Sequence, residues 1–151
     1  MTSPGTHKLL IRAGTQADVA ACTNIATDAF HIFNTERRRE HLRERASAEQ
    51  LLVALMGNTI AGYATYDKNW FRSTFLKLVV VDGQFQRQGI ATALIRAIAR
   101  DHCPHGRLFS STEDDNAPSL ALHQRLGFIP SGYLDNLPQP GRELFFFLDL
   151  T

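Results

Sequence analysis

The chain has 151 residues, 44% hydrophobic and 21% charged, which fits one domain at residues 7–151 after a short tail at residues 1–6. The formal net charge of +1 argues against nucleic acid as the main partner, and no apolar run approaches the roughly 20 residues of a membrane-spanning helix. Two cysteines, Cys22 and Cys103, each within a predicted helix, argue against a disulfide framework or a metal site, and with no secretory signal we expect a cytoplasmic protein with reduced thiols.

The first third of the chain predicts a strand, two helices and a hairpin. The strand covers residues 8–12, and Thr15 is the expected N-cap of the first helix. Apolar residues at helical spacing follow in that helix: Val19, Cys22, Ile25, Ala26, Ala29 and Phe30. The second helix, residues 34–46, is rich in arginine and glutamate and forms either a solvated face or a wall of a substrate cleft. Gly57-Asn58 then joins two strands, residues 50–56 and 59–66, as a hairpin.

The middle of the chain predicts a loop, a strand and a long helix. In the loop, residues 67–73, Trp70 and Phe71 either line a pocket or plug the core. The strand, residues 74–81, ends in three valines, which is typical of a strand buried on both faces. Apolar residues then recur at helical spacing: Ala91, Leu94, Ile95, Ile98 and Ala99.

The turn between this strand and this helix, QRQGIA at residues 86–91, is a candidate anion site. Gly89 has no Cβ that would keep a ligand away from the backbone. The first N–H groups of the helix lack partners within the helix and lie at the positive end of its dipole, where a phosphate or pyrophosphate is favoured. The alternative interpretation is a tight connection without a ligand, and the segment is neither a dinucleotide fingerprint nor a P-loop.

The last third predicts a strand at residues 107–112, an acidic turn, a helix and two further strands. Asn116 is the expected N-cap of the helix, and Gly127 ends it. The helix has an apolar side formed by Leu120, Leu122 and Leu126. The strands, residues 128–133 and 143–150, are joined by a loop rich in proline and glycine at residues 134–141. Phe145 to Phe147 place aromatic side chains on both faces of the last strand, so that one face is either a homodimer interface or covered within the chain.

Two motifs resemble the GNAT N-acetyltransferase superfamily. Residues 86–91 resemble its acyl-CoA signature, Gln/Arg-x-x-Gly-x-Gly/Ala, and residues 116–128, NAPSLALHQRLGF, resemble its segment from an asparagine to Gly-Phe. The motifs stand in the family's order and at its usual distance, and the predicted element order also matches. The resemblance implies an α/β (α+β) fold with a mixed, mostly antiparallel central sheet of about seven strands and helices on both faces.

The resemblance also implies acetyl-CoA as co-substrate, with no metal. The backbone of residues 79–81 would bind the pantetheine arm, and an N–H near Val80 would polarise the thioester carbonyl. The N–H groups from Arg87 to Thr92 would hold the pyrophosphate, and Arg87 and Arg125 are candidates to meet CoA phosphates. The cofactor-binding residues expected in this way are Val79, Val80, Val81, Gln86, Arg87, Gln88, Gly89, Ile90, Ala91, Thr92 and Asn116.

The expected reaction is direct transfer of the acetyl group to a primary amine, in which an ammonium loses a proton and the departing thiolate gains one. The family commonly uses a tyrosine on the helix after the asparagine for the second task and a strand glutamate for the first. This sequence has His123 at the tyrosine position, and Lys77 and Ser111 where the carboxylate often lies. His123 is therefore the candidate acid, favoured if Glu113 or Asp115 lies near it, or else a partly exposed histidine without a role. Glu113 is the candidate base; alternatively, the amine loses its proton to water.

Three functions remain open at this point. The first is an N-acetyltransferase acting on a small amine or a peptide, and the second is a module that binds acyl-CoA or a partner protein without turnover. The third, a transferase acting on aminoacyl-tRNA, is disfavoured by the near-neutral charge. The fold does not fix the acceptor, and Asp135 and Glu40 are carboxylates that either anchor a cationic amine or are simply hydrated.

Overall fold

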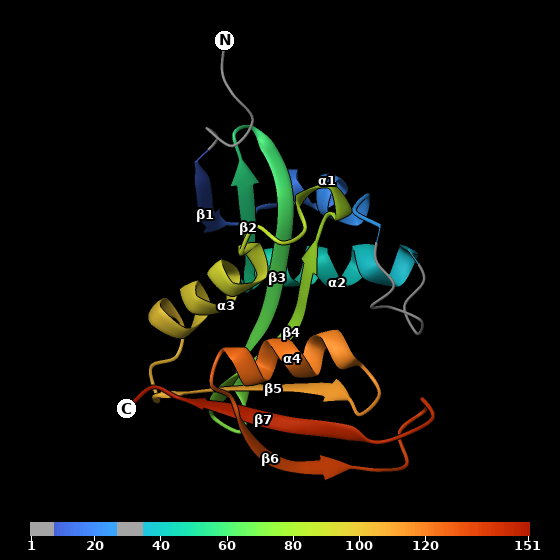
Figure 1. Ribbon diagram of the computed structural model, residues 1–151. Coiled ribbons are helices and arrows are strands. Elements are labelled where there is room, and N and C mark those ends of the chain that lie inside the picture. Colours follow the sequence, from blue (N-terminus) through green and yellow to red (C-terminus); the bar gives the residue numbers. More distant parts are fainter. Residues whose placement is uncertain (1–7, 27–34) are drawn as a thin grey trace. The chain divides into compact units, whose positions relative to one another are not determined.

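The computed structural model describes residues 8–26 and 35–151, with the helices and strands labelled in Figure 1. In chain order they are β1 (Leu9–Ala13), α1 (Val19–Thr23), α2 (Thr35–Ser47), β2 (Leu51–Met56), β3 (Thr59–Trp70), β4 (Ser73–Val81), α3 (Ile90–Asp101), β5 (Arg107–Glu113), α4 (Ala117–Arg125), β6 (Ile129–Leu134) and β7 (Glu143–Asp149). Two short 3₁₀ turns, Gln16–Asp18 and Gly83–Phe85, precede α1 and α3.

The strands form a seven-stranded sheet in the order β1-β2-β3-β4-β5-β7-β6. The pairs β1–β2, β2–β3, β5–β7 and β6–β7 are antiparallel, whereas β4 and β5 run parallel. This confirms the predicted fold class, a mixed and mostly antiparallel sheet combined with helices.

Contacts between residues divide the chain into two compact units. The first unit comprises residues up to Tyr66 together with Leu78–Ala97, and the second comprises Asp67–Lys77 and Ile98–Thr151. That both belong to one domain at residues 7–151 stays a prediction. The predicted tail at residues 1–6 lies outside the described residues.

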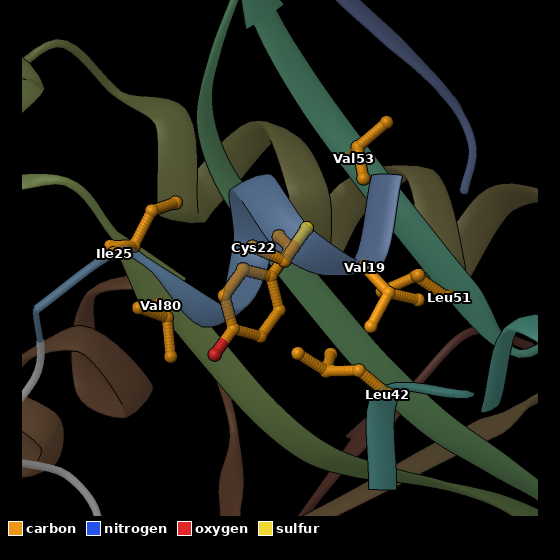
Figure 2. Close-up of a cluster of buried hydrophobic side chains, with 8 residues drawn as sticks. Val19, Cys22, Ile25, Leu42, Leu51, Val53 and Val80 are labelled. Carbon is orange, nitrogen blue, oxygen red and sulfur yellow. The ribbon is translucent and has the colours of Figure 1, made fainter. Parts of the chain in front are cut away.

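The first unit has an apolar core to which α1, α2 and three strands contribute. Figure 2 shows Val19 and Cys22 of α1, Leu42 of α2, Val53 of β2 and Val80 of β4 gathered in it. Helix α1 ends at Thr23, earlier than predicted. Ala26, which was expected in its apolar stripe, lies outside the helix and is exposed. Ala29 and Phe30 of the predicted stripe lie outside the described residues.

The N-terminus of α1 is fixed by an acidic residue. The Asp18 carboxylate accepts hydrogen bonds from the Thr15 backbone N–H at 2.8 Å and from the Arg12 guanidinium at 2.8 and 3.0 Å. Thr15 thus begins a helical segment as predicted, although its first turn is 3₁₀. The carboxylate links β1 to the start of α1 and so positions the core residues of that helix.

The inner side of α2 is polar, which neither interpretation of this helix anticipated. Leu42 is fully buried, but beside it the His41 Nε2 lies 2.9 Å from the Thr65 hydroxyl. One turn away, the Arg45 guanidinium donates to the Gln50 side-chain oxygen at 2.7 Å, and the Arg38 guanidinium donates to the Thr23 carbonyl. The solvated face is therefore only the outer half of the helix.

The second unit contains a hairpin where a loop was predicted at residues 67–73. The strands β3 and β4 continue through this segment and are joined only by Phe71 and Arg72, with φ of 48° and 58°. Two residues with positive φ are typical of a tight hairpin turn. The prediction was wrong because Trp70 packs against Phe75 and Phe109, with ring centroids 4.7 and 5.1 Å apart, and this packing outweighs the poor strand propensity of Asp67–Asn69.

The remaining predicted strands and helices are present with shifts of one or two residues at their ends. Cys103 is an exception to the predicted pattern, because it follows the end of α3 and lies outside any helix. Both cysteines are free thiols. Within residues 8–26 and 35–151, no helix is long and apolar enough to cross a membrane.

Candidate active site

One edge of β4 lacks a strand partner over most of its length. Its pairing with β5 consists of Thr74 with Leu108 and Phe75 with Phe109, and no later residue of β4 is paired on this edge within the described chain. At the far end of β4, Val80 is buried in the core of the first unit, while Val79 and Val81 are half-buried. Backbone N–H and C=O groups require partners, so this edge suits an extended ligand.

The turn after β4 is held by its own side chains. The Asp82 N–H donates to the Ala61 carbonyl of β3 at 2.8 Å, and its carboxylate accepts from the Gln84 N–H at 2.9 Å. The Gln86 side-chain amide donates to the Val81 carbonyl at 3.1 Å. Gln86, the first residue of the predicted signature, therefore ties the turn to the end of β4. This contact orients the residues that follow.

The backbone that follows forms a concave set of N–H donors. Arg87 and Gly89 both have positive φ, 64° and 75°, and α3 begins at Ile90. The Ala93 N–H donates to the Gly89 carbonyl at 3.0 Å, whereas the N–H groups of residues 90–92 have no carbonyl acceptor in the described structure. Alternating backbone conformation before a helix N-terminus creates an anion-binding concavity. A Cβ at Gly89 would meet nothing within 4 Å, so contacts within the chain do not require glycine here. Its positive φ does favour glycine.

These two features adjoin within the first unit. The unpaired strand edge runs into a turn at the start of α3, where residues 86–89 are exposed and the N–H groups of residues 90–92 lack carbonyl acceptors in the described structure. Such an arrangement suits a ligand that has an extended amide-bearing arm followed by a pyrophosphate. The donor set thus fits the predicted co-substrate.

In the second unit, His123 of α4 is buried and held at both ring nitrogens. Its Nδ1 lies 2.7 Å from the Ser119 carbonyl, which only accepts, so we assign the proton to Nδ1. Its Nε2 lies 2.8 Å from the Ser110 hydroxyl and accepts from it. The ring stacks on Phe146 with centroids 4.7 Å apart, and the residue is only 6% exposed. This differs from the partly exposed histidine that the sequence suggested as the alternative to an acid.

The electrostatic surroundings of His123 favour the neutral ring. Burial lowers its pKa, and the Ser119 carbonyl opposes this only in part. The acidic neighbour that would raise the pKa is not found, since neither Glu113 nor Asp115 contributes to the shift. The condition that would favour a protonated His123, an acidic neighbour, is therefore not met.

Glu113 lies on the other face of β5 from the Ser110–His123 pair, because side chains alternate along a strand. It is directly opposite Glu143 of β7 in the antiparallel register. The pKa of Glu143 is raised by burial and by the negative charge of Glu113, while a hydrogen bond from Ser111 lowers it. The structure thus joins Glu113 to a second carboxylate and does not bring it together with His123.

Comparison with known proteins decides the family. A model of the acetyltransferase (GNAT) family matches residues 19–128 of the chain. The chain belongs to the GNAT family. An L-methionine sulfoximine/L-methionine sulfone acetyltransferase from Pseudomonas paraeruginosa is 31% identical, over 72% of this chain and 65% of that relative, so the match spans less than two thirds of the curated relative's length.

Solved GNAT structures share the fold. The crystal structure of a GNAT acetyltransferase from Bacillus cereus superposes with a TM-score of 0.83 and 28% identity, covering 95% of this chain and 99% of the other. A putative acetyltransferase from Salmonella typhimurium, solved with acetyl-CoA, gives a TM-score of 0.73 and 23% identity, covering 95% and 94%. The element order predicted from the sequence is thus that of a GNAT fold.

The remaining residues discussed for this site are Asn116, which caps a helix, and three cations. Asn116 caps α4 as predicted, since its side-chain oxygen accepts from the Ser119 N–H at 3.2 Å; its role toward the cofactor stays a prediction. Arg87 and Arg125 are exposed. Lys77 is exposed too, with its ammonium 5.9 Å from the centre of the Phe75 ring. The cap gives Asn116 a structural role, while the three cations are exposed residues.

The acceptor residues suggested by the GNAT resemblance are mostly engaged elsewhere. Asp135 pairs with Arg142 at 2.9 Å and is not a free carboxylate. Trp70 packs into an aromatic cluster, which favours the core plug. Glu40 lines an open hollow along α2 that contains none of the predicted catalytic or cofactor-binding residues. Glu143 is the residue that sequence reasoning missed, because only the β5–β7 register places it beside Glu113.

Proposed function

We propose that the protein is an N-acetyltransferase that moves an acetyl group from acetyl-CoA directly to the primary amine of an α-amino acid or a close derivative. The observation that carries this proposal is the unpaired edge of β4 leading into the N–H concavity before α3. Membership of the GNAT family supports the reaction. The Pseudomonas relative supports the acceptor class, because methionine sulfoximine and methionine sulfone are both α-amino acids.

The backbone of the first unit would bind the co-substrate. Acetyl-CoA, when bound, supplies an activated acetyl thioester. The N–H and C=O groups of residues 79–81 pair with an extended arm, and the N–H groups from Arg87 to Thr92 receive the pyrophosphate. A backbone N–H near Val80 stabilises negative charge that develops on the carbonyl oxygen.

We assign the role of base to Glu113, with Glu143 as its partner. Two carboxylates at opposed positions repel each other, and burial together with the charge of Glu113 raises the pKa of Glu143. Two negative groups side by side favour a cation beside them. An ammonium is therefore attracted and can deliver its proton to a carboxylate. Loss of the ammonium proton to water remains the alternative.

His123 remains the proposed acid for the departing thiolate. The assignment requires a proton at Nε2, which accepts from Ser110 in the described structure. The hydroxyl of Ser110 must then rotate so that its oxygen no longer donates to the ring. Because burial lowers the pKa of His123, this role would be confined to lower pH than for an ordinary histidine.

The test is release of free CoA thiol from acetyl-CoA in the presence of L-methionine sulfone, other L-amino acids, polyamines and short peptides. We expect thiol release that depends on an α-amino acid. A folded protein that releases no thiol with any amine contradicts the proposal.

A second function is favoured by the separation of the catalytic candidates on two faces of β5. It is a module that binds acyl-CoA without turnover. Calorimetry that detects acetyl-CoA binding, together with no thiol release across the amine panel, selects this function.

The setting of the protein is also a proposal. We retain a cytoplasmic location, which is supported by two free thiols, Cys22 and Cys103. A homodimer through β7 stays a prediction as well. Phe146 packs on His123, while Phe145 and Phe147 pack on Trp70 and Phe109, so both faces of β7 have partners within the second unit.

A further inference from the structure

The core of the first unit contains a polar atom that nothing satisfies. Tyr63 of β3 is fully buried, and its hydroxyl has no hydrogen-bond partner in the described part of the chain. Its neighbours in the cluster are apolar and include Val19, Leu42 and Val80. A buried hydroxyl without a partner destabilises a fold relative to phenylalanine of the same shape. Within residues 8–26 and 35–151, no group pairs with this hydroxyl.

Tyr66, on the same strand, is also buried, but its hydroxyl has a hydrogen-bond partner. Tyr66 is 1% exposed, and its hydroxyl donates to the Glu49 carbonyl at 3.2 Å. Two buried tyrosines three residues apart thus differ in whether the hydroxyl is hydrogen-bonded within the described chain. This difference makes Tyr66 a matched control.

A cation lies near the unsatisfied hydroxyl. The Arg38 guanidinium of α2 donates to the Thr23 carbonyl, and its positive charge acts on the Tyr63 phenol. Burial raises the pKa of Tyr63 far above its ordinary value, so the phenol stays protonated and is a donor. A neutral O–H donor beside a guanidinium favours a ligand group that accepts hydrogen bonds and is negative, and it disfavours an ammonium.

We infer that Tyr63 and Arg38 bind the α-carboxylate of the amino-acid acceptor. This inference rests on the proposed function and adds to it the residues that select an amino acid over a simple amine. Val80 belongs to the same buried cluster, and its backbone is the proposed partner of the thioester. A carboxylate held by Tyr63 therefore places the α-amino group, one carbon away, toward the reacting end of β4. Because Tyr63 is fully covered, side chains around it must move on binding, as is common at binding sites.

The experiment is calorimetric titration of the CoA-loaded protein with L-methionine sulfone, a panel of other L-amino acids, and 3-(methylsulfonyl)propylamine, which lacks the carboxylate. We expect the amine to bind at least about tenfold more weakly than L-methionine sulfone. Tyr63→Phe should weaken amino-acid binding by about tenfold or more and leave amine binding unchanged, in line with loss of a hydrogen bond to a charged group. Tyr66→Phe should bind both ligands as the wild type does.

Each outcome decides the inference separately from the enzyme assignment. Amino-acid binding by Tyr63→Phe within twofold of wild type, equal binding of the amine, or no binding of any amino acid overturns the inference. Thiol release with amines alone, unaffected by Tyr63→Phe, retains the transferase and removes the carboxylate site. Carboxylate-dependent binding that Tyr63→Phe abolishes, without any thiol release, retains the site and removes the transferase.

Discussion

Gly62 of β3 tests whether the end of β4 is as tightly placed as the proposed cofactor site requires. A Cβ built at Gly62 would lie 2.8 Å from the Val80 carbonyl oxygen, 3.2 Å from the Ile90 Cγ2 and 3.4 Å from the Val81 Cα. The first of these contacts is with backbone, which cannot rotate away as a side chain can. Gly62→Ala must therefore push β4 or α3 outward.

The expected size follows from two opposing effects. Overpacking a well-packed site costs about 1–3 kcal/mol, whereas alanine lowers the entropy of the unfolded chain and returns about 0.4–1 kcal/mol. The net loss of stability for Gly62→Ala then lies between about 0 and 2.6 kcal/mol, with a middle value of about 1.3 kcal/mol. At Gly83 a Cβ would meet nothing within 4 Å, and its φ is not positive. Gly83→Ala should therefore be neutral or stabilise by up to about 1 kcal/mol.

Equilibrium denaturation in urea measures both variants against the wild type, and calorimetry with acetyl-CoA measures the binding site. We expect Gly62→Ala to lose stability and to bind acetyl-CoA more weakly, because the displaced residues 80 and 81 carry the proposed backbone contacts. Gly83→Ala should keep both properties. Equal stability of the two variants, or unchanged acetyl-CoA affinity in a destabilised Gly62→Ala, would refute the reasoning.

Three further predictions concern single residues. Gly89→Ala should cost about 1 kcal/mol of stability, because Gly89 has φ of 75°, and should weaken acetyl-CoA binding; calorimetry showing wild-type affinity contradicts the role of this turn. Asp18→Asn should destabilise by roughly 1 kcal/mol at pH 7. The hydrogen bond from Arg12 holds the pKa of Asp18 in the folded protein below its ordinary 3.8. The stabilisation is therefore fully present above 3.8 and is lost as pH falls below 3.8 and through the lowered pKa, so denaturation curves of variant and wild type should converge in acid. His123→Ala should lower turnover with little change in acetyl-CoA affinity. Because burial lowers the pKa of His123 below 6.5, wild-type stability should fall as pH drops below 6.5 and the variant should lack this dependence; identical pH profiles of rate and stability refute both statements.

Features that depend on local chemistry were predictable from the sequence. Gly57-Asn58 forms the predicted hairpin turn, Asn116 caps α4, and Gly127, with φ of 85°, follows the end of that helix. At residues 86–91 the first N–H groups of α3 lack carbonyl partners in the described structure, as the sequence indicated. In each case the signal and the structure lie within a few residues, so one sequence is sufficient.

Features that depend on pairing between distant residues were not predictable. The hairpin at Phe71-Arg72 exists because Trp70 finds Phe109 on another strand. The polar inner side of α2 depends on Thr65 and Gln50, which the helix pattern does not contain. The environment of His123 depends on Ser110, thirteen residues earlier in the chain, which supplies the hydroxyl at its Nε2.

The same distinction separates the two halves of the proposed chemistry. A co-substrate held by backbone groups needs only an open strand edge and a turn of fixed φ, and these are local properties that a short motif specifies. An acceptor is selected by side chains, and tertiary contacts decide which of their polar groups already have hydrogen-bond partners. Tyr63 and Tyr66 are both buried tyrosines of β3, but the Tyr66 hydroxyl donates to the Glu49 carbonyl, whereas the Tyr63 hydroxyl has no partner in the described part of the chain. Acceptor specificity in this chain should therefore change through substitutions that leave the motif at residues 86–91 untouched.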